Sequence, residues 1–306
     1  MPFSLIFATS CKKHFMKITS IKAPVAAKIP TEINTHGDVR IDNYFWMRLS
    51  DEQKNEKEKD SQTNDVLGYL NAENDYYNQI TEHTKDFQTS LFEEMKARIK
   101  EDDESVPYKK NGYFYITKFG KGQQYPIYTR KKGSLEAQEE LLFDANKLAK
   151  NHDYFQLGGL NVSRNNELIA FAIDTVSRRQ YVIQVKNLVT GEVYKDKITN
   201  TNGGSVWAND NKTLFYTKKD PSSLRSYKIF KHVLGTDASE DVEVFHETDD
   251  TFGTFVTKTK STKYIIIGSF STLSSEYQFL DADNPDDSFK IIQKRERNLE
   301  YDIAHY

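Results

Sequence analysis

The stretch LFYTKKDPSSLRSYKIFKHVLGT, Leu214 to Thr236, contains two alternating apolar runs, a polar turn between them and a closing glycine. Alternation of apolar and polar residues is typical of β-strands with one buried face, and Asp, Pro and Ser together are typical of a turn. The stretch therefore predicts two antiparallel strands joined by a short loop.

Three further segments repeat this order of strand, polar loop, strand and turn. They are YFYITKFGKGQQYPIYTRKKG (113–133), LIAFAIDTVSRRQYVIQVKNLVTGE (168–192) and YIIIGSFSTLSSEYQFLDADNP (264–285). The copies recur at about 45 to 55 residues, which fits a four-stranded propeller blade, and runs such as SLEAQEELLFD (134–144) and VEVFHE (242–247) supply the remaining strands. No Trp-Asp pair occurs, so the repeat is not of the WD40 class. The sequence predicts a mainly β protein with an incomplete propeller of about four blades.

The region before the repeats has a different pattern. Residues 23–37 are mostly polar and contain several prolines. Further on, Tyr44, Phe45 and Trp46 form an aromatic cluster that we expect to be buried as an anchor. The mixed-charge run 51–65 predicts a solvated loop or helix surface. Between residues 65 and 100 apolar residues follow a 3.6-residue period, which predicts two amphipathic helices. We expect the first helix to begin after Asn64 or Asp65, and we expect no helix beyond Val106.

Composition excludes several classes of function. Of 306 residues, 42 are Lys or Arg and 45 are Asp or Glu, and no basic cluster with interleaved aromatics appears, so we expect no nucleic-acid partner. Cys11 is the one cysteine, which excludes an internal disulfide framework, and the seven histidines are too scattered for a zinc motif. We therefore expect neither a metal nor a cofactor.

The first residues, MPFSLIFATSCKK, place Cys11 after the small residues Ala8, Thr9 and Ser10, as at the end of a bacterial lipoprotein signal. The run lacks a positive charge before Cys11 and its apolar stretch is short for a signal peptide, so a start codon assigned at the wrong position is the alternative. No segment has the roughly 18 consecutive apolar residues that a transmembrane helix needs. We expect a cytoplasmic or periplasmic protein, with lipid attachment at Cys11 as a further alternative.

Several motifs resemble the prolyl oligopeptidase family of serine peptidases, and within it the oligopeptidase B group. The residues Asp42, Tyr44, Trp46 and Arg48 in IDNYFWMRLSD are similar to an entry motif of the family, and VLGYLNAENDYY (66–77) is similar to its following helix. LNVSRNNE (160–167) resembles a blade turn in which an Asn pair provides the left-handed geometry usually given by glycine. HVLGTDASEDVEVFHE (232–247) follows the oligopeptidase B pattern most closely.

The resemblance implies a helical N-terminal segment that forms part of a split α/β-hydrolase domain, followed by a propeller that has seven blades in the family. The final residues EYDIAHY (300–306) resemble a lead-in to a further blade, so we expect the chain to stop within the propeller. The G-x-S-x-G motif of an α/β-hydrolase is absent from the 306 residues, and the family's Ser-Asp-His triad would lie beyond them. We therefore predict no catalytic residue here and an inactive chain when it is alone.

Other candidate sites have simpler interpretations. Residues 281–288, DADNPDDS, lack the glycine and glutamate of a calcium loop and predict a blade turn. Residues 101–105, EDDES, predict a solvated hinge, and residues 118–123, KFGKGQ, predict a hairpin loop because they do not match a phosphate-binding loop. Ser163, Ser205 and Ser271 lie near turns without a neighbour that activates a hydroxyl, and we interpret them as turn residues.

The sequence thus predicts a leader or wrongly assigned start in residues 1–16, a helical segment in residues 17–105 and a partial propeller in residues 106–306. By resemblance, the parent enzyme is a serine endopeptidase that hydrolyses short peptides after Arg or Lys, with the propeller limiting access and a C-terminal hydrolase domain as partner. The alternatives are a non-catalytic peptide-binding propeller and a proline-specific oligopeptidase. Because a four-blade propeller is open, we expect the chain alone to self-associate or aggregate.

Overall fold

The structure is a computed structural model and describes residues 21–306, so Cys11 lies outside the described residues. The chain divides into two compact units, Met1–Lys100 and Glu101–Tyr306. Among the described residues no helix is both long enough and apolar enough to cross a membrane.

The N-terminal unit begins with a hairpin that the sequence analysis did not predict. Strand β1 (Thr31–Thr35) pairs with β2 (Asp38–Asp42) in antiparallel register. The two turn residues, His36 and Gly37, both have positive φ, 55° and 85°. Two central residues with positive φ match the right-handed twist of the flanking strands, which is why the turn needs only two residues.

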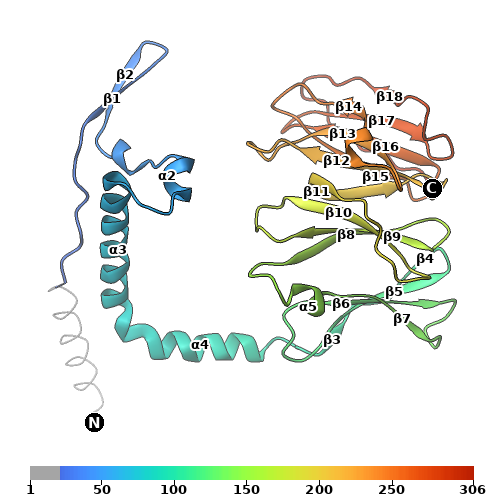
Figure 1. Cartoon of the computed structure of the whole chain (residues 1–306), viewed down its shortest axis with the longest axis horizontal. Helices are drawn as coiled ribbons and strands as arrows, with labels where there is room; N and C mark the ends of the chain where they lie inside the picture. Colours follow the sequence, from blue (N-terminus) through green and yellow to red (C-terminus); the bar gives the residue numbers. More distant parts are fainter. Residues whose placement is uncertain (1–20) are drawn as a thin grey trace, which may run out of the picture. The chain divides into compact units, whose positions relative to one another are not determined.

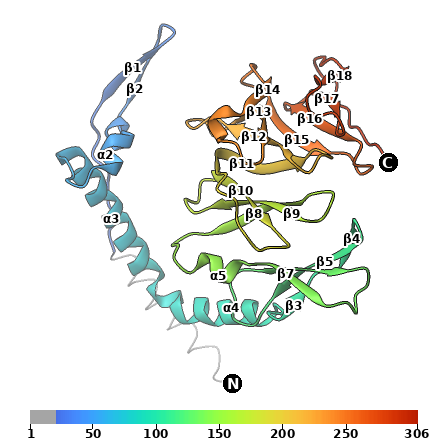
Figure 2. The same cartoon turned by 45° about the vertical axis from the view of Figure 1, so that its right-hand side comes forward.

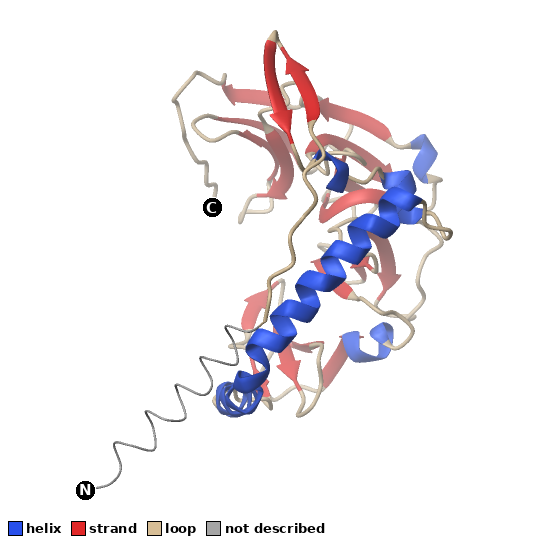
Figure 3. Cartoon of the chain, turned by 90° about the vertical axis from the view of Figure 1, so that its left-hand side faces the viewer, coloured by secondary structure: helices blue, strands red, loops and turns tan. Residues whose placement is uncertain are grey.

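The helices of this unit start earlier than the sequence pattern indicated. The unit contains η1 (Phe45–Met47), α2 (Asp51–Asn55), α3 (Ser61–Thr81), η2 (Glu82–Thr84) and α4 (Lys85–Ala97), and Figure 3 shows α3 along its length. The predicted start of the first helix after Asn64 or Asp65 is wrong, because Asp60 is the N-cap and its carboxylate accepts from Thr63 N at 2.7 Å. The first turn is polar and carries no apolar period, so periodicity alone located the helix too late.

Much apolar surface of this unit is exposed. The expected burial of the aromatic cluster is wrong for Tyr44 and Phe45, which are exposed, whereas Trp46 donates from Nε1 to Ala27 O at 2.9 Å. The apolar stripes of α3 and α4 are exposed too, at Leu67, Leu70, Tyr77, Leu91, Phe92, Met95 and Ile99. Exposed apolar stripes of this kind are typical of interaction sites and of aggregation-prone surfaces.

The second unit consists of four antiparallel blades, which follow one another from green to red in Figures 1 and 2. The first blade has β3 (Asp103–Glu104), β4 (Tyr108–Lys110), β5 (Tyr113–Phe119), β6 (Ile127–Lys132) and β7 (Glu139–Asp144). The second has β8 (Gln156–Val162), β9 (Leu168–Asp174), β10 (Tyr181–Asn187) and the start of β11 (Ile198–Trp207). The third has the rest of β11, β12 (Thr213–Lys219), β13 (Ser226–Val233) and β14 (Val242–His246). The fourth has β15 (Gly253–Lys258), β16 (Tyr264–Phe270), β17 (Ser275–Asp281) and β18 (Lys290–Gln293).

Strand β11 belongs to two blades. It pairs with β10 at Ile198 and Thr201 and with β12 at Thr201 and from Ser205 to Trp207, and the register with β12 shifts between Thr201 and Ser205. The mainly β fold and the count of about four blades are confirmed. The prediction of no helix beyond Val106 is wrong, because a short helix, α5 (Ala145–Ala149), follows β7 and η3 (Ala238–Glu240) precedes β14. Asp144 caps α5 by accepting from the amides of Asn146 and Lys147.

Apolar layers between consecutive blades form the core. In β9, Ile169 and Phe171 join the cluster shared with the first blade, whereas Ala170 and Ala172 join the cluster shared with the third. In β12, Tyr216 faces the second blade, and its neighbour Phe215 packs with the fourth. The central strands are therefore apolar at nearly every position, because both faces of a middle blade are covered.

The first hairpin turn of each blade has a residue in the left-handed region. The four residues are Asn111, Asn166, Asn211 and Thr262, with φ from 47° to 65°. The prediction that the Asn pair at 165 and 166 supplies this geometry is confirmed at Asn166, which has φ 65°. These turns are also bonded to one another: Asn166 Nδ2 donates to Asn111 O at 3.2 Å, and Asn165 N donates to Asn211 Oδ1 at 2.9 Å. The Asn residues thus serve both the turn and the joint between blades.

A buried histidine joins the second and third blades. His232 is 1% exposed, and its Nδ1 lies 2.6 Å from Asp241 Oδ1 while its Nε2 lies 3.3 Å from Asp196 Oδ2. Tyr216 Oη donates to the other oxygen of Asp241 at 2.8 Å. Burial lowers the pKa of His232, but the hydrogen bonds and charges of Asp241 and then Asp196 outweigh burial, so the pKa is raised above its ordinary value. The geometry fits an imidazolium that donates from both ring nitrogens.

We predict that the stability of this unit depends on the charge of His232. A raised pKa in the folded state means that the stabilisation is complete below the ordinary histidine pKa of about 6.5 and is lost as pH rises through the folded value. At pH 6, His232→Gln should lower the free energy of unfolding by about 3 kcal/mol, as when one partner of a buried ion pair is removed. Urea unfolding followed by tryptophan fluorescence from pH 5 to 9 measures this difference, with the exposed His246→Gln as control. Parallel pH profiles of the His232 variant and the unaltered chain would contradict the prediction.

We also predict that Gly159 is required for the close approach of β8 and β11. A Cβ at Gly159, where φ is 62°, would lie 2.0 Å from Gly203 O. Gly191 has φ 80° and open space around it, so Gly191→Ala introduces backbone strain alone, roughly 1–2 kcal/mol. Gly159→Ala should cost clearly more than this control in urea unfolding, because strand backbones must also separate. Equal losses of unfolding free energy would show that β8 and β11 separate without cost.

Candidate functional site

The serines considered in the sequence analysis are bonded within turns or lie buried. Ser163 Oγ donates to Asn165 Oδ1 at 2.6 Å, and Ser271 Oγ donates to Ser274 O at 3.4 Å. Ser205 lies within β11 and is 7% exposed, so its interpretation as a turn residue is wrong. Both ring nitrogens of His232 are occupied by carboxylates, so this buried ring has no nitrogen left to act as a general base.

The acidic segments have separate partners. In residues 281–288, Asp283 accepts from Asn209 Nδ2 at 2.7 Å and Asp286 pairs with Lys231 Nζ at 2.6 Å, so these carboxylates face different groups. Residues 103–104 form β3 and pair with β5, and residues 120–123 lie in the loop of the β5–β6 hairpin. Within residues 21–306, no three His, Cys, Asp or Glu side chains are arranged to hold a metal ion.

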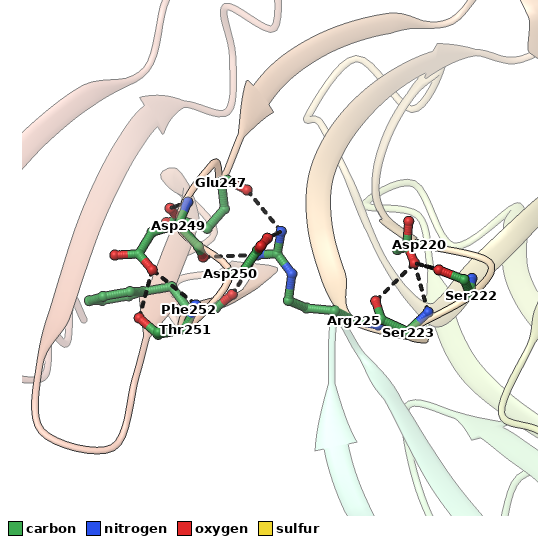
Figure 4. Close-up of polar contacts among 9 residues, drawn as sticks. All are labelled: Asp220, Ser222, Ser223, Arg225, Glu247, Asp249, Asp250, Thr251 and Phe252. Atoms are coloured by element: carbon green, nitrogen blue, oxygen red, sulfur yellow. Dashed lines mark hydrogen bonds and ion pairs between the residues drawn. The ribbon is translucent and has the colours of Figure 1, made fainter. Parts of the chain in front are cut away.

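Two loops at the junction of the third and fourth blades are held by a network of polar contacts (Figure 4). The first loop joins β12 to β13, and Asp220 shapes it by accepting from the amides of Ser222 and Ser223, at 3.1 and 2.7 Å, and from both hydroxyls. Hydrogen bonds from Ser223 N and then from the Ser222 hydroxyl lower the pKa of Asp220 to about 2. The carboxylate therefore stays charged and holds the turn that precedes Arg225.

Arg225 connects this turn to the second loop, which joins β14 to β15. Its Nη1 donates to Phe252 O at 2.7 Å and to Asp249 O at 3.1 Å. Its Nη2 lies 3.1 Å from Asp250 Oδ1 and donates to Glu247 O at 3.3 Å. A planar guanidinium with several fixed donors suits this task, so one side chain holds the loop at four points.

A second arginine holds the same loop from the fourth blade. Arg295, which follows β18, donates from Nη2 to Glu247 Oε2 at 2.6 Å and lies 3.5 Å from Glu276 Oε1. Its guanidinium lies over the ring of Phe252, 4.1 Å from the ring centroid. The loop 247–252 is therefore fixed by one arginine before it and one after it in the chain.

Two hollows adjoin this loop. The larger, about 580 Å³, is lined by Asp220, Ser223, Arg225, Tyr227, His246, Thr248 and Asp250. The other, about 490 Å³, is lined by residues that include Thr251, Phe252, Ser274, Arg295 and Asn298. These walls offer carboxylates, hydroxyls, amides and aromatic rings, which can make polar contacts to a bound molecule.

Sequence reasoning missed both arginines. Asp-Pro-Ser-Ser before Arg225 is a recognisable turn, but the carbonyl that it binds most closely belongs to Phe252, 27 residues later. Likewise, Arg295 binds Glu247 across 48 residues. A pattern of neighbouring residues cannot reveal contacts between residues so far apart in the sequence.

Residues 24–306 match the family model of the prolyl oligopeptidase N-terminal β-propeller domain. The chain is 39% identical over 302 residues to dipeptidyl aminopeptidase BI of Pseudoxanthomonas mexicana, covering 94% of this chain and 40% of that protein. It is 31% identical over 293 residues to protease 2 of Moraxella lacunata, covering 94% and 41%.

Solved structures give the same result. Oligopeptidase B from Leishmania major superposes with a TM-score of 0.81 and 30% identity, covering 93% of this chain and 41% of that one. Oligopeptidase B from Trypanosoma brucei, in a closed form with covalently bound antipain, gives 0.80 and 27% over the same shares. The chain thus spans about two fifths of the length of these relatives. The chain belongs to the prolyl oligopeptidase family, as the N-terminal propeller portion of an oligopeptidase B-like peptidase.

Proposed function

We propose that this chain supplies the propeller of a serine peptidase that hydrolyses short peptides after Arg or Lys. The observation that carries the proposal is the match of residues 24–306 to the family's propeller domain, together with the TM-score of 0.81 to an oligopeptidase B. In this proposal the nucleophile belongs to a hydrolase domain in the remaining length of the relatives, because no G-x-S-x-G motif occurs in the 306 residues.

The proposed reaction is acylation of a serine by the scissile carbonyl, with a histidine as general base, followed by attack of water on the acyl-enzyme. The propeller acts by sterics. A folded protein cannot place an extended segment in a narrow entrance without losing its own packing, whereas a short peptide can. The arginine-fixed loop 247–252 supports this role, because a rigid wall excludes large substrates better than a mobile one.

A second candidate is release of dipeptides from a free amino terminus. The identity of 39% over 302 residues to a protein named dipeptidyl aminopeptidase favours it. Such an enzyme must recognise the ammonium group of its substrate, whereas an endopeptidase must accept a chain on both sides of the cleaved bond. The two candidates therefore differ in their response to a blocked amino terminus.

We predict that activity requires both halves of the enzyme. The chain should be co-produced with the C-terminal hydrolase portion of protease 2 of Moraxella lacunata, the relative with 31% identity, and assayed with fluorogenic peptides that end in arginine. We expect no hydrolysis by the chain alone, and hydrolysis by the pair that disappears when the serine of the G-x-S-x-G motif is replaced by alanine. A blocked peptide cleaved at least tenfold faster than its unblocked dipeptide counterpart supports the endopeptidase, and the reverse supports dipeptide release. Equal hydrolysis of folded proteins by the pair and by the hydrolase portion alone would contradict the gating role.

We also predict self-association of the chain by itself through its exposed apolar stripes. Sedimentation velocity should show a mean mass that rises with concentration, and replacing Phe92 and Met95, both more than half exposed, by serine should reduce this rise. Lys96→Ser, on the same helix, is the matched control. A monomer at all concentrations would show that the stripes of α3 and α4 need no partner.

A further inference from the structure

Two Asn-Gly pairs occur in the chain, at residues 111–112 and 202–203. In such a pair the peptide nitrogen of the glycine can attack the side-chain carbonyl of the asparagine, because no Cβ on the glycine shields the nitrogen. The first pair forms the two-residue turn between β4 and β5, and the second lies within β11, where the register with β12 shifts. The fold therefore gives the same local sequence two different surroundings.

The first pair is exposed. Asn111 and Gly112 have φ of 47° and 79°, the geometry that Asn-Gly favours in a two-residue hairpin turn. Lys110 and Tyr113 are paired across the turn, so the hairpin ladder does not use the Gly112 amide. Within residues 21–306, no hydrogen bond holds the side chain of Asn111. This side chain can therefore turn toward the Gly112 nitrogen without breaking a contact.

The second pair is held by hydrogen bonds on both reacting groups. Asn202 Oδ1 accepts from Gly204 N at 2.8 Å, and Asn202 Nδ2 donates to Ser226 Oγ at 3.4 Å. Gly203 is buried, and its amide donates to Thr201 Oγ1 at 3.2 Å. Removal of the amide proton and rotation of the asparagine side chain both require local opening of β11, which a strand between two blades resists.

We propose that Asn111 is a site of spontaneous modification, which converts it to aspartate and isoaspartate with water as the co-reactant. The Gly112 nitrogen loses its proton to water and attacks Cγ of Asn111. A C–N bond forms, the bond from Cγ to Nδ2 breaks, and Nδ2 takes up a proton and leaves as ammonia. Water then opens the five-membered imide at either carbonyl, which gives an aspartate or an isoaspartate residue.

The isoaspartate product changes a joint between blades. In isoaspartate the main chain runs through Cγ and gains one carbon, while the former main-chain carbonyl becomes a carboxylate. In the unmodified chain that carbonyl of Asn111 accepts from Asn166 Nδ2 of the second blade at 3.2 Å. The added carbon also displaces Lys110 relative to Tyr113 across the turn. The modification therefore weakens both the first hairpin and its bond to the second blade.

The test incubates the unaltered chain at pH 7.5 and 37 °C and follows both asparagines by peptide mass spectrometry. Methyl transfer by an isoaspartyl methyltransferase counts the isoaspartate. We expect Asn111 to react about tenfold faster than Asn202 or more, because only Asn202 needs local opening of the fold. An equal or faster reaction at Asn202 would overturn the proposal.

Synthetic peptides of residues 107–116 and 198–207 are the matched control. Without the fold, both should react at similar rates, since each contains Asn-Gly. A difference between the peptides as large as that in the folded chain would show that the neighbouring sequence sets the rates, which would also overturn the proposal.

A second arm tests the consequence for the joint. Asn111→Asp introduces the same charge as the modification without the extra main-chain carbon, and aspartate tolerates the left-handed region. We expect the aged chain, with its isoaspartate counted by methyl transfer, to unfold at a lower urea concentration than the freshly prepared variant. Equal urea midpoints would contradict the weakening of the joint.

Discussion

The fold depends on one constraint: a four-stranded blade has two apolar faces, and each must be covered by a neighbouring blade. The β9 segment meets this constraint by directing Ile169 and Phe171 to one neighbour and Ala170 and Ala172 to the other. Large residues on one face and small ones on the other set how closely each neighbour approaches. At Gly159 the approach is so close that a Cβ has no room against Gly203 O.

Cations that reach backbone carbonyls of the adjacent blade connect the sheets at their edges. Arg130 donates to Asn166 O at 2.9 Å, Lys186 to Leu142 O at 3.0 Å and Lys219 to Arg179 O at 3.0 Å. Burial lowers the pKa of Lys186 and of Lys219, because a carbonyl compensates a charge only in part. The blades are thus joined by hydrogen bonds that carry an electrostatic cost, which the apolar layers offset.

Arginine side chains that bind carbonyls and carboxylates also hold the loops beside the fourth blade. Arg225 and Arg295 hold the loop 247–252 from either side, and Asp220 fixes the turn that positions Arg225. A surface built this way has a defined shape but contains no activated nucleophile. In the function proposed above, this surface is part of the entrance that a peptide passes.

The sequence by itself determined the blade repeat, because strand alternation and turn residues are local properties that recur in each copy. It also determined the family, through segments such as residues 232–247. The structure gives a physical reason for that segment: His232 and Asp241 are two members of one buried cluster. Only the tertiary structure decided that Asp196 and Tyr216 complete the cluster, that Asp60 caps α3, and that Arg225 and Arg295 bind the loop 247–252 between the third and fourth blades. These contacts join residues far apart in the chain, or depend on a single capping hydrogen bond, and neither leaves a periodic signal in the sequence.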